Sequence, residues 1–463
     1  MNWSALLPEL TLSAGVLTLF TLELLYGKKA FKAATLLAAL FLALAAVSTL
    51  FTAHPERLFF GGFTVDALSL AGKLLLYALA ALVLVSSYDY FIKRNSPYGE
   101  LPYLYLLAVL GMSVMLSSDN LAVVFTGLEL SSITLYLLAG LFKNDYPSKE
   151  GAFKYLVIGT TGTSMFALGS AFVYAATGSL RTVPYEGENA FFALGVVLIL
   201  SALALKASAV PFHFWTPDAY EGAPTPTTAF MAAVPKLALY FLLVKLTYTL
   251  LSSFEDWRLF VVLLAVASML VGNLAAYAQT SLKRLFAYSS VAHAGYFLTA
   301  LTAVDEHLFA ALLFYVFAYG TATVGVFTLL TVLEKALGRP ARLDDLKGLY
   351  RTAPGTALLF ALFLFAFIGI PPLALFWGKL GIFFGLVKAE LFTVGVLFAL
   401  GSLLSVGYYL RLVVLMFLTE PEREVKTALS GGEAFTLSFA ALATLALGLA
   451  PQTVLDLLLR ALP

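Results

Sequence analysis

The chain has 463 residues, of which 61% are hydrophobic and only 12% charged, and its formal net charge is +1. Its mean hydropathy is +0.92. A soluble protein of this length needs more charge, so lipid is the solvent for most of the chain. Cysteine is absent, which excludes thiolate-bound iron–sulfur clusters and Cys-ligated zinc. The four histidines, at 54, 213, 293 and 307, are scattered, and the near-neutral charge argues against nucleic acid.

Apolar runs of about 20 residues predict fourteen membrane-spanning helices and hence an all-α polytopic membrane protein. The spans are expected at 3–26, 33–53, 67–91, 101–117, 120–142, 150–177, 190–212, 224–251, 259–279, 285–302, 308–334, 355–387, 391–418 and 433–458. The first run lacks a small-residue cleavage site, so we interpret it as a retained span. The longest polar connection, 334–354, is too short to fold alone.

The distribution of basic residues predicts the orientation in the membrane. An even number of spans places both termini on one side. Of the 28 Lys and Arg residues, sixteen lie in alternate loops, five in the opposite loops and the C-terminal end, and seven within spans. Since basic loops stay on the inner side, we expect both termini on the outer side.

Charged residues within the spans divide into two groups. An ionised residue at the centre of a span costs about 2.5–3.5 kcal/mol, whereas one near an end reaches water with its long side chain. We interpret the residues near span ends in this second way: Glu23, Asp89, Lys154, Lys245 and Arg411. Lys73, six residues into the third span, fits either group.

Four charges lie deep in spans five, seven, eight and twelve. They are Glu129 in "FTGLELSSITLY", Lys206, Lys236 in "AAVPKLALYF" and Lys379 in "GIPPLALFWGKLG". Two static ion pairs would explain them structurally, but three lysines face one glutamate. At least one lysine must then be neutral part of the time or in contact with buried water. Because a dry environment favours the neutral amine, the pattern favours proton transfer.

Helix breakers fall within two of the spans. Pro211 in span seven and Pro371–Pro372 in span twelve free backbone groups that lipid cannot satisfy, which is tolerated only in a protein interior or beside a water-filled cavity. Because the breaks are five spans apart, we predict two five-helix repeats, spans 4–8 and 9–13. Each repeat has an odd number of helices, so the second crosses the membrane with a topology inverted relative to the first. We therefore divide one antiporter-like domain, 1–463, into 1–100, 101–251, 257–418 and 431–463. The repeat is imperfect, because Lys206 precedes its proline and Lys379 follows its pair.

His293 lies midway along span ten, with Ser289, Ser290 and Tyr296 on the same helical face. Two interpretations carry about equal weight. Either His293 is a hydrogen-bonded core residue, or it is functional, as histidines within spans usually are.

Four stretches of the chain resemble a known family. They are Pro8–Glu9, "LKASAVPFHFWTPDAYEGAPTPTTAFMAAVPK" (205–236), "SLKRLFAYSSVAHAGY" (281–296) and "GIPPLALFWGKL" (369–380). They are similar to the subunit N family of the proton-translocating NADH–quinone oxidoreductase, respiratory complex I, whose mitochondrial counterpart is NADH dehydrogenase subunit 2. The long proline-rich stretch is specific to the antiporter-like superfamily, and "DAYEGAPTP" with "VPK" favours subunit N over its sister subunits.

The resemblance implies a fourteen-span module that moves protons while other subunits oxidise NADH and reduce quinone. By motif match, Glu129 and Lys206 are partners, Lys236 is the linking lysine and Lys379 the terminal one. We assign supporting roles to His213, His293, Ser290 and Tyr296, and none to a metal. The resemblance places FMN and the iron–sulfur clusters in other subunits of the complex. These subunits and the sister antiporter-like subunits are the expected partners of this chain. We expect the chain in the cytoplasmic (inner) membrane of a prokaryote, with both termini on the periplasmic side.

Two other functions are compatible with parts of the sequence. A Mrp-type cation/proton antiporter subunit, or the matching subunit of a membrane-bound hydrogenase, shares "P-F-H-x-W-x-P-D", "P-T-P" and a "G-K" after the prolines of span twelve. A purely structural membrane scaffold is the third interpretation, and the unpaired deep lysines argue against it.

Overall fold

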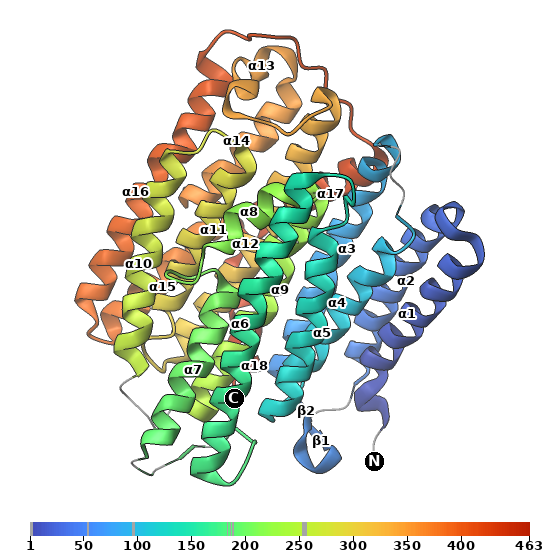
Figure 1. Ribbon diagram of the computed structural model, residues 1–463. Helices are drawn as coiled ribbons and strands as arrows, with labels where there is room; N and C mark the ends of the chain where they lie inside the picture. Colours follow the sequence, from blue (N-terminus) through green and yellow to red (C-terminus); the bar gives the residue numbers. More distant parts are fainter. Residues whose placement is uncertain are drawn as a thin grey trace.

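The computed structural model describes residues 3–52, 55–94, 98–182, 184–185, 187, 189–251 and 257–463. His54 lies outside these residues. The described chain is a bundle of long helices with one small antiparallel hairpin, β1 (Glu56–Leu58) and β2 (Phe63–Val65) (Figure 1). The all-α prediction is confirmed.

Each predicted span coincides with a helix or with a broken pair of helices. The first eight correspond to α1 (Leu7–Tyr26), α2 (Phe31–Leu50), α3 (Ala67–Lys93), α4 (Leu101–Leu116), α5 (Leu121–Ala139), α6 (Tyr146–Thr177), α7 (Ala190–Ala207) and α9 (Thr225–Leu246). The others correspond to α10 (Trp257–Tyr277), α11 (Leu282–Thr299), α12 (Glu306–Leu337), α14 (Pro354–Ile368) with α15 (Ala374–Lys388), α16 (Phe392–Leu418) and α17 (Gly431–Leu449). Three short helices, α8 (Trp215–Gly222), α13 (Leu349–Thr352) and α18 (Pro451–Ala461), complete the fold. The fourteenth span is shorter than predicted, because α17 ends at Leu449 and its expected last turns, up to 458, belong to α18, which begins at Pro451.

Both predicted helix breaks are present. α7 ends at Ala207, Ser208 follows with a φ of 68°, and the chain passes Pro211 before α8 begins. α14 ends at Ile368, Gly369 follows with a φ of 88°, and α15 begins beyond Pro371–Pro372. Proline cannot donate the backbone hydrogen bond that would continue either helix.

Loop contacts relate the two predicted repeats. Leu121 N donates to Leu180 O at 2.8 Å, and Leu282 N donates to Ala341 O at 3.3 Å. Both partners are shifted by 161 positions (282 − 121 = 161; 341 − 180 = 161). Five spans, an odd number, separate the two contacts along the chain, so they lie at opposite ends of the bundle.

The same shift relates the breaks themselves. Pro211 corresponds to Pro372 (372 − 211 = 161), and the left-handed cap Ser208 corresponds to Gly369 (369 − 208 = 161). We infer from these matches that the helices of spans 4–8 and 9–13 form two inverted repeats.

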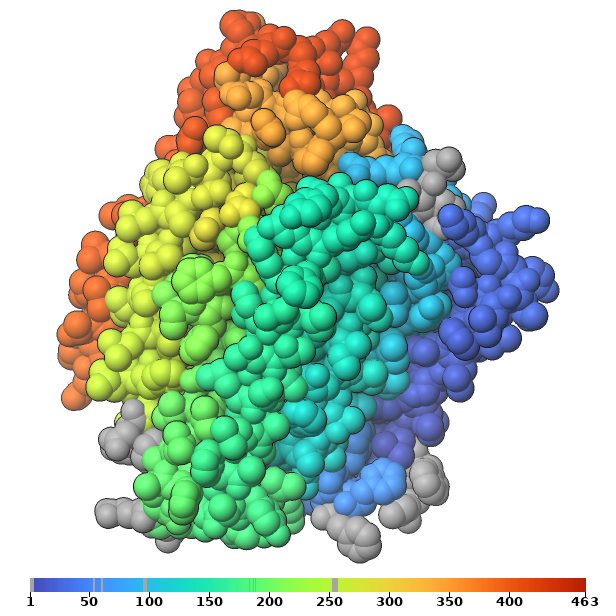
Figure 2. Space-filling view, in the orientation of Figure 1, coloured from blue at the N-terminus to red at the C-terminus, as the bar shows by residue number. Residues whose placement is uncertain are grey.

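The two ends of the bundle differ in charge. We name the end that holds the loops 140–145, 278–281, 338–353 and 419–430 the basic end, and the end that holds the hairpin and the loops 117–120 and 300–305 the far end. The connection 338–353 is held at the basic end by ion pairs. Asp345 accepts from Arg339 at 2.7 Å and also from Arg423, and Lys347 lies 2.5 Å from Glu422. In the face shown in Figure 2, the N-terminal helices (blue) form one flank.

Glycines bring α4 and α5 into backbone contact. A Cβ added to Gly127 would lie 2.5 Å from Gly111 O, and one added to Gly111 would lie 2.6 Å from Gly127 O. Small residues permit such approach between membrane helices. Because Glu129 follows Gly127 by two residues, this contact fixes the position of the glutamate relative to α4.

Replacing Gly127 by valine tests that contact. The added methyl groups meet backbone atoms that cannot move aside, so we expect a loss of about 1–3 kcal/mol of stability and a lower Tm of the protein in detergent. Gly355→Val is the matched control, because no atom lies within 4 Å of a Cβ built there. An unchanged Tm for Gly127→Val would contradict the packing described.

Candidate functional site

Glu129 and Lys206 lie close together without forming a direct ion pair. Glu129, on α5, accepts a hydrogen bond from Thr163 Oγ1 of α6. Lys206, in the last turn of α7, donates from Nζ to Ser132 Oγ at 2.8 Å and to Tyr136 OH at 3.1 Å. Ser132 and Tyr136 follow Glu129 by three and seven residues on α5 and so share its face. The carboxylate and the ammonium group therefore have separate polar partners.

One turn of α6 connects these two groups. Thr163 Oγ1 lies 3.2 Å from Gly159 O, and Lys206 Nζ lies 3.4 Å from the same carbonyl. Gly159 leaves room for Tyr136, since a Cβ there would lie 2.1 Å from the Tyr136 hydroxyl. The Thr163 hydroxyl thus faces two acceptors, the Glu129 carboxylate and the Gly159 carbonyl, and the carbonyl that it shares with Lys206 connects the two sites.

Lys236 is buried on α9 and contacts only neutral groups. Its Nζ donates to Ser290 O at 3.0 Å and to Ser290 Oγ. Tyr220 OH of α8 lies 3.5 Å from the same Ser290 Oγ. In the described part of the chain, Lys236 has no carboxylate within ion-pair distance.

His293 lies on α11, one turn beyond Ser290, and is fully buried. Its Nδ1 is 3.0 Å from Tyr315 OH of α12, and its Nε2 is 3.3 Å from Tyr409 OH of α16. Both ring nitrogens thus have a partner. His293 is a hydrogen-bonded core residue. Along the chain, its helix α11 comes between α9, which carries Lys236, and α15, which carries Lys379.

Lys379 is held by the broken end of α14. Its Nζ donates to Phe367 O at 2.9 Å, to Ile368 O at 3.0 Å and to Ser402 Oγ of α16 at 2.9 Å. Carbonyls in the last turn of a helix have no intrahelical partner and carry partial negative charge. The ring of Tyr296 lies 5.3 Å from the same ammonium group. The break at Pro371–Pro372 thus supplies the acceptors of this lysine.

His213 lies apart from these contacts. It is in the break between α7 and α8, near the rings of Phe214 and Tyr288. Among the described residues, its Nδ1 has no hydrogen-bond partner. The remaining supporting residue, Tyr296, donates to Gly401 O at 2.7 Å.

Several partners of Glu129, His293 and the lysines were not predicted from the sequence. Ser132 and Tyr136 could have been found, because their spacing from Glu129 is helical. Thr163 and Ser402 are on other helices, and nothing in their local sequence marks them. Tyr315 and Tyr409, the partners of His293, also lie in apolar sequence that does not distinguish them from other tyrosines.

Two lysines near span ends are buried in ion pairs. Lys73 is fully buried and lies 2.7 Å from Glu9 Oε1, which resolves its ambiguous position. Our interpretation of Lys245 as reaching water is wrong, because its side chain is only 8% exposed and lies 2.9 Å from both Asp66 and Asp119. These acids come from the start of α3 and from the α4–α5 loop, which could not be placed from sequence.

A cavity of about 770 Å³ lies at the basic end beside α8. Charged residues of both signs line it, including Asp145, Glu150, Asp218, Glu221 and Arg284. Asp218 pairs with Lys154 at 2.7 Å and with Arg284 at 2.6 Å. The short helix α8, which follows the break in span seven, therefore lines a polar cavity.

Comparisons with known proteins agree with these features. Residues 118–405 match the family described as "NADH:quinone oxidoreductase/Mrp antiporter, TM". The chain is 62% identical to NADH-quinone oxidoreductase subunit N 1 of Aquifex aeolicus over 463 residues, 100% of both chains. It is 37% identical to NADH-quinone oxidoreductase subunit N of Thiobacillus denitrificans, covering 100% of this chain and 98% of that one.

Solved structures extend the comparison. A chain of respiratory complex I from Thermus thermophilus with bound aureothin is 35% identical, with a TM-score of 0.84 and coverage of 97% of this chain and 98% of that one. A chain of the Mrp complex from a Dietzia species has a TM-score of 0.89 at 20% identity, covering 100% and 97%, which shows a shared fold alone. The chain therefore belongs to the subunit N family of NADH-quinone oxidoreductase, within the NADH:quinone oxidoreductase/Mrp antiporter transmembrane proteins.

Proposed function

We propose that this chain translocates protons as a membrane subunit of an NADH–quinone oxidoreductase, and that Glu129, Lys206, Lys236 and Lys379 carry the proton. One observation supports this above the others: the three lysines are held by hydroxyl and carbonyl groups and not by carboxylates. Such partners accept hydrogen bonds from an ammonium group without fixing its charge. NADH, FMN, iron–sulfur clusters and quinone belong to partner subunits in this proposal, and this chain holds no redox centre.

Movement of the Glu129 carboxylate controls the first proton transfer, from Lys206 to Lys236. When its carboxylate turns from Thr163 to Lys206, it stabilises the charged lysine, and when it turns back, burial favours release of the proton. In this proposal, the contact of Glu129 with Thr163 belongs to the open arrangement. The released proton passes to Lys236, which is adjacent to Ser290.

Lys379 completes the path on the other side of His293. The tyrosine hydroxyls on both sides of His293 can donate and accept protons. In the inverted repeats, 101–251 and 257–418, the break of the first leads into α8, which lines the cavity at the basic end, and the inverted break of the second faces the far end. Protons are therefore taken up at the basic end and released at the far end.

A Mrp-type antiporter or hydrogenase subunit is the second candidate. The Mrp chain is similar in fold but shares only 20% identity, whereas subunit N relatives match at full length. Native purification of the complex distinguishes the two. Flavin and iron–sulfur subunits in the same particle support the first function, and a multi-subunit antiporter without them supports the second. A structural scaffold would have no use for three lysines without counterions.

Cysteine labelling tests the orientation in the cytoplasmic membrane, with both termini and the far end outside. Asn144→Cys at the basic end and Ala190→Cys at the far end introduce single exposed thiols, because the native chain has no cysteine. We expect an impermeant reagent to label the thiol at 190 in intact cells and the one at 144 only after permeabilisation. The opposite pattern would reverse the orientation.

Lys379→Ala tests the terminal exchange step. We expect loss of most proton pumping by the assembled complex, with intact NADH oxidation by the peripheral subunits, because the variant keeps the break but removes the amine beside it. Pumping is measured in vesicles and assembly on a native gel. The control is Lys388→Ala on the same helix, where the side chain is 65% exposed. Normal pumping by fully assembled Lys379→Ala excludes the role.

A double-mutant cycle tests the partnership of Glu129 and Lys206. Removing one member leaves the other uncompensated whenever the pair closes, a cost of about 3–5 kcal/mol at a dry site. We expect Glu129→Gln and Lys206→Ala each to impair pumping severely, the double variant to be little worse, and Glu129→Asp to be partly active. If the two defects in pumping rate multiply, the residues act independently and the switch is wrong.

A further inference from the structure

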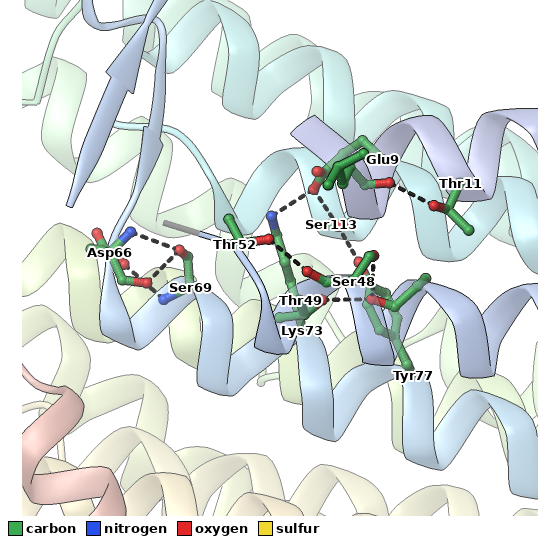
Figure 3. Close-up of polar contacts among 12 residues, drawn as sticks. Glu9, Thr11, Ser48, Thr49, Thr52, Asp66, Ser69, Lys73, Tyr77 and Ser113 are labelled. Atoms are coloured by element: carbon green, nitrogen blue, oxygen red, sulfur yellow. Dashed lines mark hydrogen bonds and ion pairs between the residues drawn. The ribbon is translucent and has the colours of Figure 1, made fainter. Parts of the chain in front are cut away.

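A second buried Glu–Lys site lies in the N-terminal helices, outside the family match at 118–405. Figure 3 shows Glu9 of α1 and Lys73 of α3 facing each other, with Lys73 Nζ 2.7 Å from Glu9 Oε1. Ser113 Oγ of α4 donates to the same oxygen at 2.6 Å. The pair therefore joins three helices, and Lys73 is fully shielded from solvent.

Hydroxyl groups extend this site toward the bundle interior. Tyr77 OH lies 2.7 Å from Ser113 Oγ, and Tyr77 is one turn further along α3 than Lys73 (Figure 3). Both hydroxyls can donate and accept, so they can pass a proton. Glu9 Oε2 is buried and has no hydrogen-bond partner among the described residues. The other oxygen, Oε1, faces the Ser113 hydroxyl and is the one that can receive a proton from it.

The site lies between the linking lysine and the far end. A Cβ added to Gly72, the neighbour of Lys73, would lie 2.9 Å from the Phe241 ring, so α3 contacts α9 at this level. Lys236 is five residues closer to the basic end on α9, about 8 Å along the helix axis. The pair is therefore displaced from Lys236 toward the far end.

A partly exposed acidic residue lies at the start of α3, nearer the far end than Lys73. Asp66 is the N-cap of α3, and its side chain accepts from Ser69 N. That side chain is 31% exposed and lies 2.9 Å from Lys245 Nζ. Tyr77, Lys73 and Asp66 therefore follow one another along the chain of α3 from the interior to the far end.

Helix packing alone does not require this ion pair. Well-packed apolar residues in place of a buried ion pair are often neutral or stabilising, and ionisable groups at membrane depth usually serve function. We propose that Glu9 and Lys73 form a proton-release site on the far side of the membrane. Ser113 passes its hydroxyl proton to Glu9 Oε1 and takes the proton of Tyr77 OH, and the proton released from Lys236 restores the Tyr77 hydroxyl. Glu9 thereby becomes a carboxylic acid beside the Lys73 ammonium group. Loss of that proton toward Asp66 restores the carboxylate and the ion pair.

This inference rests on the proposed proton translocation, and its test uses the assembled complex in liposomes. The variants are Glu9→Gln, which keeps the shape of the side chain, and Glu9→Gln/Lys73→Met, which removes both charges and leaves no unpaired ion. The number of protons pumped per NADH is measured, together with assembly on a native gel. We expect the double variant to assemble fully and to lose pumped protons per NADH.

Glu23→Gln is the matched control, since it makes the same change on α1 beyond the reach of the pair. Full pumping by the assembled double variant would show that the pair is only a structural clasp, and an equal loss in Glu23→Gln would show that the effect is unspecific. Either result overturns the proposal. If the double variant does not assemble, Tyr77→Phe decides, because it keeps both charges and removes one hydroxyl. Normal pumping by Tyr77→Phe also overturns the proposal.

The same assay separates this inference from the proposed function. Glu129→Gln and Lys206→Ala are measured in parallel. If they leave pumping intact, the proposed function itself fails. If they stop pumping while the Glu9 and Lys73 variants pump normally, only the release site is wrong.

Discussion

Lipid offers no hydrogen bonds, and every amine buried in this bundle must therefore find its partners in the protein. The chain meets this constraint mainly with neutral oxygens. Lys206 uses a serine and a tyrosine of α5, Lys236 uses one serine of α11, and Lys379 uses the last carbonyls of α14. Lys73, Lys245 and Lys335 instead have carboxylates as partners. The choice of partner thus separates amines whose charge is fixed by a counterion from amines whose charge is not.

The inverted repeats place different chemistry at equivalent positions. The shift of 161 residues that relates the loops and the breaks also relates Glu129 to Ser290 (290 − 129 = 161) and Ser132 to His293 (293 − 132 = 161). In the first repeat an acid and a serine lie beside Lys206. In the second repeat Ser290 and His293 occupy those positions. Ser290 accepts from Lys236, and His293 lies on the proposed path to Lys379. The backbone arrangement is therefore shared, while only the first half keeps a negative charge at this position.

The sequence predicted the parts of the molecule that depend on composition along the chain. The positions of the spans and both breaks followed from apolar runs and prolines, and Glu129 and the lysines stood out because charge is rare at that depth. Partners on distant helices could not be predicted. Thr163 and Ser402 are ordinary residues in apolar helices, and the burial of Lys245 depends on Asp119, more than 120 positions earlier. Such contacts depend on helix packing, for which a single sequence gives no direct signal.

The broken end of α14 gives Lys379 a second role. A helix that continued would satisfy the carbonyls of Phe367 and Ile368 with amide hydrogens from its next turn. In this chain the ammonium group of Lys379 replaces those amides. When the side chain moves away, two carbonyls lose their donor inside the membrane and must be solvated instead. Departure of the lysine therefore draws water into the break, so that a single side-chain movement both opens the hydrated path and exposes the amine to it.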